Sequence, residues 1–292
     1  MLFLNRKKVL RSELGFIYKS SQCKWWLKNQ SFVDLAKKIG YYVKQLSNDE
    51  DEVISDIEIL KRAEKKIVLR IFHNNTEKSS HDERSFIVKI FFLKQLSHKL
   101  KYCRYGLDEA VNLITAKKRG IKSSAVFGYA NLYDRCRLVN ASIILMEDLC
   151  HLKPIGDMMK NSSDEQRGKL FMSTIPLIIS LYKANCNHID VNAGAVMLSG
   201  CEPDNDIALI DFQHAKFYET RRTEILAYEC AYFAGCCKQW VRDSAVYDWF
   251  DQILRDADIV DIGEKSRLKR RFDFYFPDSA RLLSRKHRKK IY

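Results

Sequence analysis

The stretch His188-Ile189-Asp190-Val191-Asn192 is followed, 21 residues after its aspartate, by Ile210-Asp211-Phe212. The first aspartate comes after a long helical pattern at residues 164–185, and the second ends a short apolar run. Two carboxylates that do different work in one site need different surroundings. We therefore predict that Asp190 lies on a loop after a helix, and that Asp211 lies where a strand ends.

An apolar run at residues 85–92 carries a single lysine, Lys89. The run predicts a buried strand, in which an ammonium group is unfavourable unless it meets an anion. Glu109 is the candidate partner, because it lies in a predicted helix at residues 104–119 that Gly120 would stop. The sequence therefore predicts an ion pair between Lys89 and Glu109.

Further strands are predicted around this run. Residues 141–149 are expected to form a strand and the hinge that follows it, and residues 53–60 and 66–72 two earlier strands. The turn between these two earlier strands, residues 61–65, contains no glycine.

Together these segments resemble the lipopolysaccharide kinases, the bacterial Kdo and core-heptose kinases, within the wider protein-kinase-like fold. Residues 108–113 with Arg119-Gly120-Ile121 resemble that family's glutamate-bearing helix and its end. Residues 188–193 resemble its variant catalytic loop, in which an asparagine stands two positions after the aspartate. Residues 209–213 and Arg221-Arg222 also fit, so that the resemblance spans roughly residues 56–240.

The resemblance implies a phosphotransferase that uses ATP and Mg2+. Asp190 would accept the proton of the attacking hydroxyl, and Asp211 would hold the metal against the phosphates. Lys89, paired with Glu109, would fix the α and β phosphates of the nucleotide.

An adenine site is implied near the hinge. Met146 would lie at the back of the pocket, and the Glu147 carbonyl and the Leu149 amide would bind the base. Asn192, on the catalytic loop, would assist the bound nucleotide and its metal.

Three departures from the family pattern concern the metal and the phosphates. Ala195 stands five residues after Asp190, where kinases place an asparagine that binds a second magnesium. Gln213 replaces the glycine after Asp-Phe, and no glycine-rich loop precedes the Lys89 strand. Either Asp211 holds a single metal with help from Asn192 or Gln213, or catalysis is weak or lost.

The expected architecture is α+β, a two-lobed protein-kinase-like fold with a small β-rich N-lobe and a helical C-lobe. With 292 residues, of which 46% are hydrophobic, the chain can bury a substantial core. We expect an N-terminal helical extension at residues 1–52, in which a helix at residues 23–45 carries Trp25-Trp26. The nucleotide-binding N-lobe would be residues 53–149, and the C-lobe residues 150–292.

The formal net charge of +13 is concentrated at the end of the chain. Residues 265–292 hold eleven Lys and Arg against Asp273 and Asp278, a net +9. Interleaved aromatic and leucine residues make this an amphipathic basic segment, which suits an anionic membrane surface or a phosphate-rich substrate. No nucleic-acid-binding motif accompanies the charge, so nucleic acid is not an expected partner.

Nine scattered cysteines without paired metal-binding spacings indicate reduced thiols rather than a zinc site. The apolar run at the start is shorter than a signal peptide needs, and no apolar window is long enough for a membrane span. We therefore expect a cytoplasmic protein that could attach peripherally to the inner membrane.

The sequence analysis favours an ATP-dependent kinase that phosphorylates a sugar hydroxyl, Kdo or heptose, of the lipopolysaccharide inner core. Two alternatives stay open. One is a kinase of another small molecule, such as an amino alcohol or an antibiotic, on the same fold. The other is a pseudokinase that binds nucleotide or a partner without turnover, which Ala195 and the missing glycine loop would explain.

Overall fold

The computed structural model describes residues 2–20, 22–47, 56–73, 84–93, 95–201 and 205–276. The chain folds as two compact units: residues up to 149 form the first, except for residues 116–123, which belong with the later residues to the second. The first unit is rich in strands and the second is mainly helical, which confirms the predicted α+β class. Residues 48–55, which include the start of the strand expected at residues 53–60, and the last part of the basic segment, residues 277–292, lie outside the described residues.

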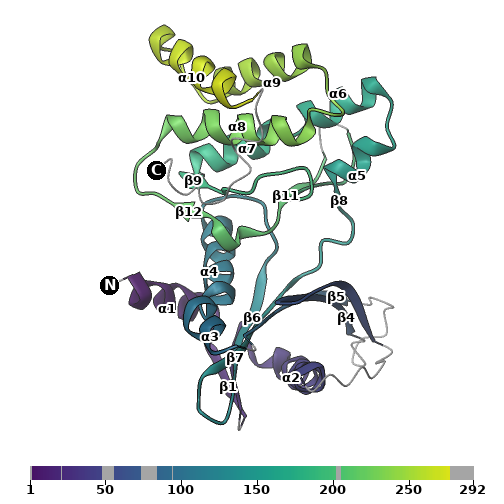
Figure 1. The fold of residues 1–292 in the computed structure, drawn as a ribbon, viewed down its shortest axis with the longest axis vertical. Coiled ribbons are helices and arrows are strands. Elements are labelled where there is room, and N and C mark those ends of the chain that lie inside the picture. Colours follow the sequence, from purple (N-terminus) through teal and green to yellow (C-terminus); the bar gives the residue numbers. More distant parts are fainter. Residues whose placement is uncertain are drawn as a thin grey trace. The chain divides into compact units, whose positions relative to one another are not determined.

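The first unit is built on an antiparallel sheet of seven strands in the order β1-β2-β6-β7-β5-β4-β3 (Figure 1). The strands are β1 (Phe16–Lys19), β2 (Cys23–Leu27), β3 (Ile57–Ala63), β4 (Lys66–His73), β5 (Arg84–Phe92), β6 (Val126–Tyr133) and β7 (Val139–Glu147). The strand expected at residues 85–92 is thus confirmed as β5. The turn expected at residues 61–65 is shorter, because β3 continues to Ala63 and leaves only Glu64 and Lys65 between the strands.

Helices cover both faces of this sheet. The helix α2 (Val33–Ser47) buries Leu35, Ile39 and Val43 against one face. The other face carries α1 (Leu2–Glu13) and α4 (Tyr105–Lys118), with the short α3 (Leu96–Tyr102) before α4 (Figure 1). Successive side chains of a strand point to opposite faces, so each strand contributes to both layers.

The helix expected at residues 23–45 is wrong in its first part. Residues 23–27 form β2, in which Trp25 packs into the core on the α2 side and the next residue, Trp26, points to the other face. Aromatic residues suit a strand that is buried on both sides. A 3-10 turn η1 (Gln30–Phe32), capped by the Asn29 side chain, then leads into α2, so this segment is part of the sheet layer and not a helical extension.

The second unit contains short strands and a helical core. Its strands are β8 (Lys153–Pro154), β9 (Cys186–Asn187), β10 (Val196–Leu198), β11 (Ile207–Leu209) and β12 (Lys216–Phe217), with the 3-10 turn η2 (Phe212–His214). Its helices are α5 (Ile155–Lys160), α6 (Asp164–Met172), α7 (Ile175–Lys183), α8 (Thr223–Cys237), α9 (Asp243–Asp256) and α10 (Ile262–Tyr275). In its core Phe171 stacks on Phe233, and Trp249 packs at a tilt against both rings.

The single long helix expected at residues 164–185 is also wrong, because it is divided into α6 and α7. Pro176 lies in the first turn of α7, where its missing N–H removes no helical hydrogen bond, whereas inside a continuous helix it would. Thr174, between the two helices, is fully buried and accepts a hydrogen bond from Trp249 Nε1 at 3.1 Å. The break is therefore built into the core.

The described part of the basic C-terminal segment is α10, whose apolar side is already covered. Leu268, Phe272 and Phe276 are buried, and Phe272 stacks on Phe250 with ring centroids 4.2 Å apart. Phe274 is 57% exposed. Apart from Phe274, the aromatic residues predicted to face a membrane thus pack in the second unit within the described range. No helix among the described residues is long and apolar enough to cross a bilayer.

Candidate active site

Lys89 and Glu109 form the ion pair that the sequence predicts. In β5, Val88 and Ile90 face the α2 side, and Lys89 therefore points to the opposite face, toward α4. Its Nζ lies 2.5 Å from Oε1 of Glu109, and the two side chains are 7% and 0% exposed. The second carboxylate oxygen of Glu109 is buried without a hydrogen-bond partner. This oxygen can therefore accept a hydrogen bond from a further donor.

Small residues fix the helix that carries Glu109. Gly106, in the first turn of α4, is so close to the sheet that an added Cβ would lie 2.4 Å from Oγ of Ser142. Any side chain at this position would push α4 away from β7. After α4, Gly120 adopts a left-handed φ of 80°, which lets the chain leave the helix as predicted. The backbone thus determines the position of the Glu109 carboxylate.

The predicted hinge follows β7 in the first unit. Met146 is 4% exposed and lies on the sheet face that carries Lys89, because Ile144, two residues earlier, is the register partner of Lys89. The Glu147 carboxylate accepts the Ala125 amide at 2.9 Å. Met146 is thus placed on the face where the sequence expects the adenine pocket, whereas the base-binding roles of Glu147 and Leu149 stay predictions.

Asp148 ties the hinge to the sheet. Its carboxylate accepts hydrogen bonds from Nε of Arg70 at 2.6 Å and from Oγ of Ser85 at 2.8 Å. The Asp148 side chain is only 4% exposed. Charge-assisted bonds from β4 and β5 therefore hold the end of β7 in place.

The loop of Asp190 lies in the second unit between β9 and β10. Asp190 is 8% exposed, and Ile189 before it has φ of 70°, a conformation that is unusual for a β-branched residue. Asn187 Oδ1 accepts the Ile189 amide at 3.0 Å and supports this conformation. Strained backbone of this kind is concentrated at functional sites.

Asn192 shapes the same loop. Its Oδ1 accepts the amides of Gly194 and Ala195 at 2.9 and 3.1 Å, and its Nδ2 donates to the Asp190 carbonyl at 2.9 Å. A side chain that bonds to backbone two or three residues on forms a local turn. Asn192 therefore positions Asp190. A metal ion bound to Oδ1 of Asn192 would share that oxygen with the amides of Gly194 and Ala195.

Asp211 follows β11, as predicted, and is exposed with φ of 62°. The preceding residue, Ile210, is bonded on both sides to the Asp190 loop. Its amide donates to the Ala195 carbonyl at 3.0 Å, and its carbonyl lies 3.0 Å from Nε2 of His188. The second unit thus brings the loops of Asp190 and Asp211 together.

His188 is a buried support of these loops. Burial lowers the pKa of His188 to about 4, although the charges of Asp190 and Asp211 oppose the shift. The imidazole is therefore neutral at pH 7, and because a carbonyl only accepts, Nε2 carries the hydrogen that bonds to Ile210. His188 therefore has an architectural role and is not a proton carrier at neutral pH.

Glu229, on α8, is a site residue that the sequence analysis missed. Its side chain is buried, and Oε1 accepts the His188 amide at 2.5 Å. Burial raises the pKa of Glu229 to about 8, while bonds from the His188 and Ile189 amides favour the charged form. An acidic residue in the otherwise apolar run 225–234 is the signal that could have revealed it.

The arginines that the sequence singled out lie against aromatic rings in the second unit. Arg119 donates to the carbonyls of Ala184 and Tyr218 at 2.8 and 2.9 Å, so it joins the segments on both sides of the Asp190 loop. Arg221 and Arg222 stack on tyrosine rings, with distances of 5.0 and 4.4 Å to the ring centroids. These contacts give all three residues a structural role.

The donor set for magnesium is small. Within the described ranges no group of three or more His, Cys, Asp or Glu side chains could hold a metal ion. Mg2+ is commonly bound by one or two carboxylates together with substrate phosphates and water. The exposed carboxylate of Asp211 fits an ion of this kind that arrives with a nucleotide, and Ala195 offers no donor for a second one.

Comparison by sequence identifies no relatives, since neither a scan against family models nor a search of curated proteins finds a match. Solved structures do match. One of them is WaaP in complex with acyl carrier protein, with a TM-score of 0.51 and 14% identity over 75% of this chain and 88% of that chain. At this identity the likeness shows the fold alone, and it confirms the predicted kinase-like fold.

Proposed function

We propose that the chain is an ATP- and Mg2+-dependent kinase that phosphorylates a sugar hydroxyl, of Kdo or heptose, in the lipopolysaccharide inner core. The buried ion pair of Lys89 and Glu109 is the observation that carries this proposal. Burying two charges is unfavourable for stability compared with a well-packed apolar pair, and such pairs are therefore often kept for function. A phosphate-binding lysine oriented by a glutamate on the next helix is the arrangement that kinases use.

In this proposal Asp190 and Asp211 have different catalytic roles. Asp190 would accept the proton of the acceptor hydroxyl and orient its oxygen, and His188, Glu229 and Asn192 would hold the loop that carries it. Asp211 would hold the magnesium ion. When bound, the ion would neutralise charge on the transferred phosphoryl group.

The acceptor is inferred from the resemblance of the motifs to the lipopolysaccharide kinases, and the likeness in fold to WaaP, a lipopolysaccharide-core heptose kinase, is consistent with it. A lipid-linked sugar acceptor would place the enzyme at the cytoplasmic face of the inner membrane. Since the apolar side of α10 is covered, attraction to that anionic surface would come from exposed basic residues such as Arg270 and Arg271. Membrane attachment would then weaken with added salt.

The proposal is tested by measuring ATP consumption with purified inner-core lipopolysaccharide as the acceptor. Asp190→Ala should lower turnover by about 10²–10⁴-fold and leave ATP affinity nearly unchanged, because the base contacts the acceptor and not the nucleotide. Asp157→Ala, which removes an exposed carboxylate on α5, is the matched control and should retain full activity. Full activity of Asp190→Ala would refute the assigned mechanism.

A pseudokinase is the second candidate, which Ala195 and the turn Glu64-Lys65 favour. The turn contains no glycine that would allow backbone amides to approach phosphates closely. Binding of ATP without magnesium, combined with no turnover on any sugar, would support this candidate. Turnover with an amino alcohol or an antibiotic instead of a sugar would favour a small-molecule kinase on the same fold.

A further inference from the structure

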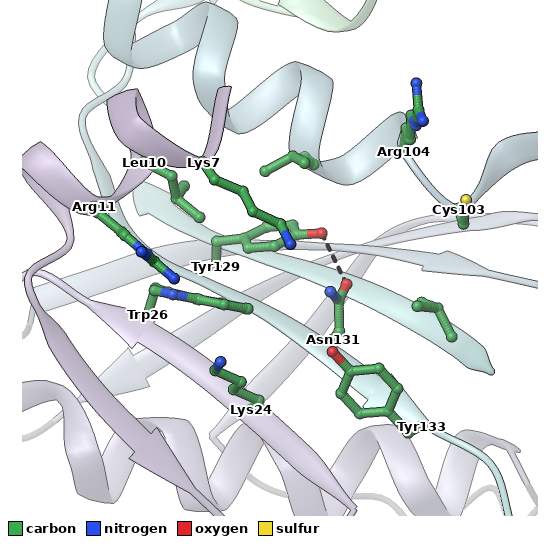
Figure 2. A pocket seen from close by; sticks show the side chains of 12 residues that line it. Lys7, Leu10, Arg11, Lys24, Trp26, Cys103, Arg104, Tyr129, Asn131 and Tyr133 are labelled. Atoms are coloured by element: carbon green, nitrogen blue, oxygen red, sulfur yellow. Dashed lines mark hydrogen bonds between the residues drawn. The ribbon is translucent and has the colours of Figure 1, made fainter. Parts of the chain in front are cut away.

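A cavity of about 350 Å³ lies in the first unit between α1, the strands β2 and β6, and the start of α4 (Figure 2). It belongs to the α1 and α4 face of the sheet. The lining residues are Lys7, Leu10, Arg11, Lys24, Trp26, Cys103, Arg104, Leu107, Tyr129, Asn131, Tyr133 and Val139. Neither Lys89 nor Glu109 is among them, so the cavity is separate from the proposed phosphate-binding pair.

The cavity gathers positive charge without a lining carboxylate. Lys7 and Arg11 extend into it from α1, Lys24 from β2, and Arg104 stands at the start of α4 (Figure 2). The pKa of Lys24 is lowered by burial and by repulsion from neighbouring cations, among them Arg11 and Lys7. An anion bound here would relieve this repulsion.

Asp108, in the first turn of α4, is paired with a residue outside the cavity. Its partner in this ion pair is Arg6 of α1. The pKa of Arg6 is lowered by burial and by the charge of Arg104.

The floor of the cavity is aromatic. The rings of Trp26 and Tyr129 lie 5.7 Å apart and are inclined by 32°, and Lys24 Nζ lies 4.7 Å from the centroid of the Trp26 ring. The Tyr129 hydroxyl donates to Oδ1 of Asn131 at 2.8 Å, as Figure 2 shows. Since this bond uses the amide oxygen, Asn131 can offer its NH2 group to a ligand. A flat ring would pack on such a floor with its anionic group toward the cations.

We propose that this cavity binds a small phosphate ester that carries a planar ring, of the size of a nucleoside monophosphate. The volume is within the usual range for small-molecule sites, which begins at about 300 Å³. Both parts of the ligand contribute to binding. The phosphate would pair with the cations Lys7, Arg11 and Lys24. The ring would pack on Trp26 and Tyr129. The proposal concerns binding and does not depend on kinase activity.

The thiol of Cys103 in the lining provides a local reporter. Adenosine monophosphate at ten times its dissociation constant should slow alkylation of Cys103 about tenfold, as measured by mass spectrometry of the full chain. The exposed thiol of Cys136 is the internal control and should react at an unchanged rate. Adenosine alone and inorganic phosphate alone should each protect Cys103 much less at the same concentration.

Variants separate this cavity from the proposed catalytic site. The double substitution Arg11→Glu and Lys24→Glu should abolish protection of Cys103, and the milder Lys24→Gln should weaken it if the double variant fails to fold. Asp211→Asn should leave protection intact, because Asp211 is exposed in the second unit and does not line the cavity. The proposal is overturned by absence of protection, by equal protection from adenosine or phosphate alone, or by loss of protection in Asp211→Asn.

Discussion

Removing both charges of the Lys89–Glu109 pair should cost clearly less stability than the two single removals added together. The side chains are 7% and 0% exposed, with 2.5 Å between Nζ and Oε1. Lys89→Met leaves a buried carboxylate and Glu109→Gln a buried ammonium, so each should lower the free energy of unfolding by about 3–5 kcal/mol. The double variant contains neither charge, and its loss should be smaller than the sum of the two by about 2–3 kcal/mol.

The free energy of unfolding would be measured by urea titration followed by circular dichroism, and ATP affinity by titration calorimetry. Both single variants should also weaken ATP binding, because the lysine then lacks either its charge or its orientation. The exposed pair Asp34–Lys37, in the same unit with N–O at 2.9 Å, is the control, and its neutralisation should change stability little. Strictly additive losses for Lys89 and Glu109 would refute the coupling.

Three further predictions follow from single residues. Ala195→Asn should add a second, weaker magnesium site to the nucleotide complex, seen by calorimetry as a change from one bound ion to two; an unchanged count would contradict the assigned position of the missing donor. Burial raises the pKa of Glu229 from 4.5 to about 8, so its protonated form contributes stability that is complete below pH 4.5 and lost as the pH rises through 8. Wild type should therefore lose stability relative to Glu229→Gln between pH 5 and 8, and a constant difference in free energy would show that the carboxyl does not titrate there. Phe272→Ala should cost about 3–5 kcal/mol of unfolding free energy, whereas the exposed Phe274→Ala should cost little; equal effects would mean that α10 does not pack as described.

Features that follow from one local physical rule could be predicted from the sequence. A lysine in a buried apolar strand is unfavourable without an anion, and Glu109 is that anion for Lys89. The end of β11 before Asp211 and the helix end at Gly120 follow from equally local rules. The ends of β11 and α4 are determined by neighbours in the chain, whereas Glu109, 20 residues from Lys89, could be predicted only because a buried lysine needs an anion.

Features that depend on contacts between segments far apart in the chain could not be predicted from local sequence patterns. The sequence around Trp25 is compatible with a helix until β6 is present to pair with it. Glu229 supports the His188 amide across 41 residues of sequence. Aromatic residues of α10 looked suited to a membrane because their packing partner, Phe250, lies on another helix.

The position of β1 and β2 at one edge of the sheet has a practical consequence for expressing this protein. The motifs that resemble known kinases begin at about residue 56, and a recombinant fragment designed around them would start there. Such a fragment would leave β6 as an unpaired edge and uncover the apolar surface under Trp25 and α2. Exposed strand edges with apolar side chains pair with other chains, so the fragment should aggregate rather than fold.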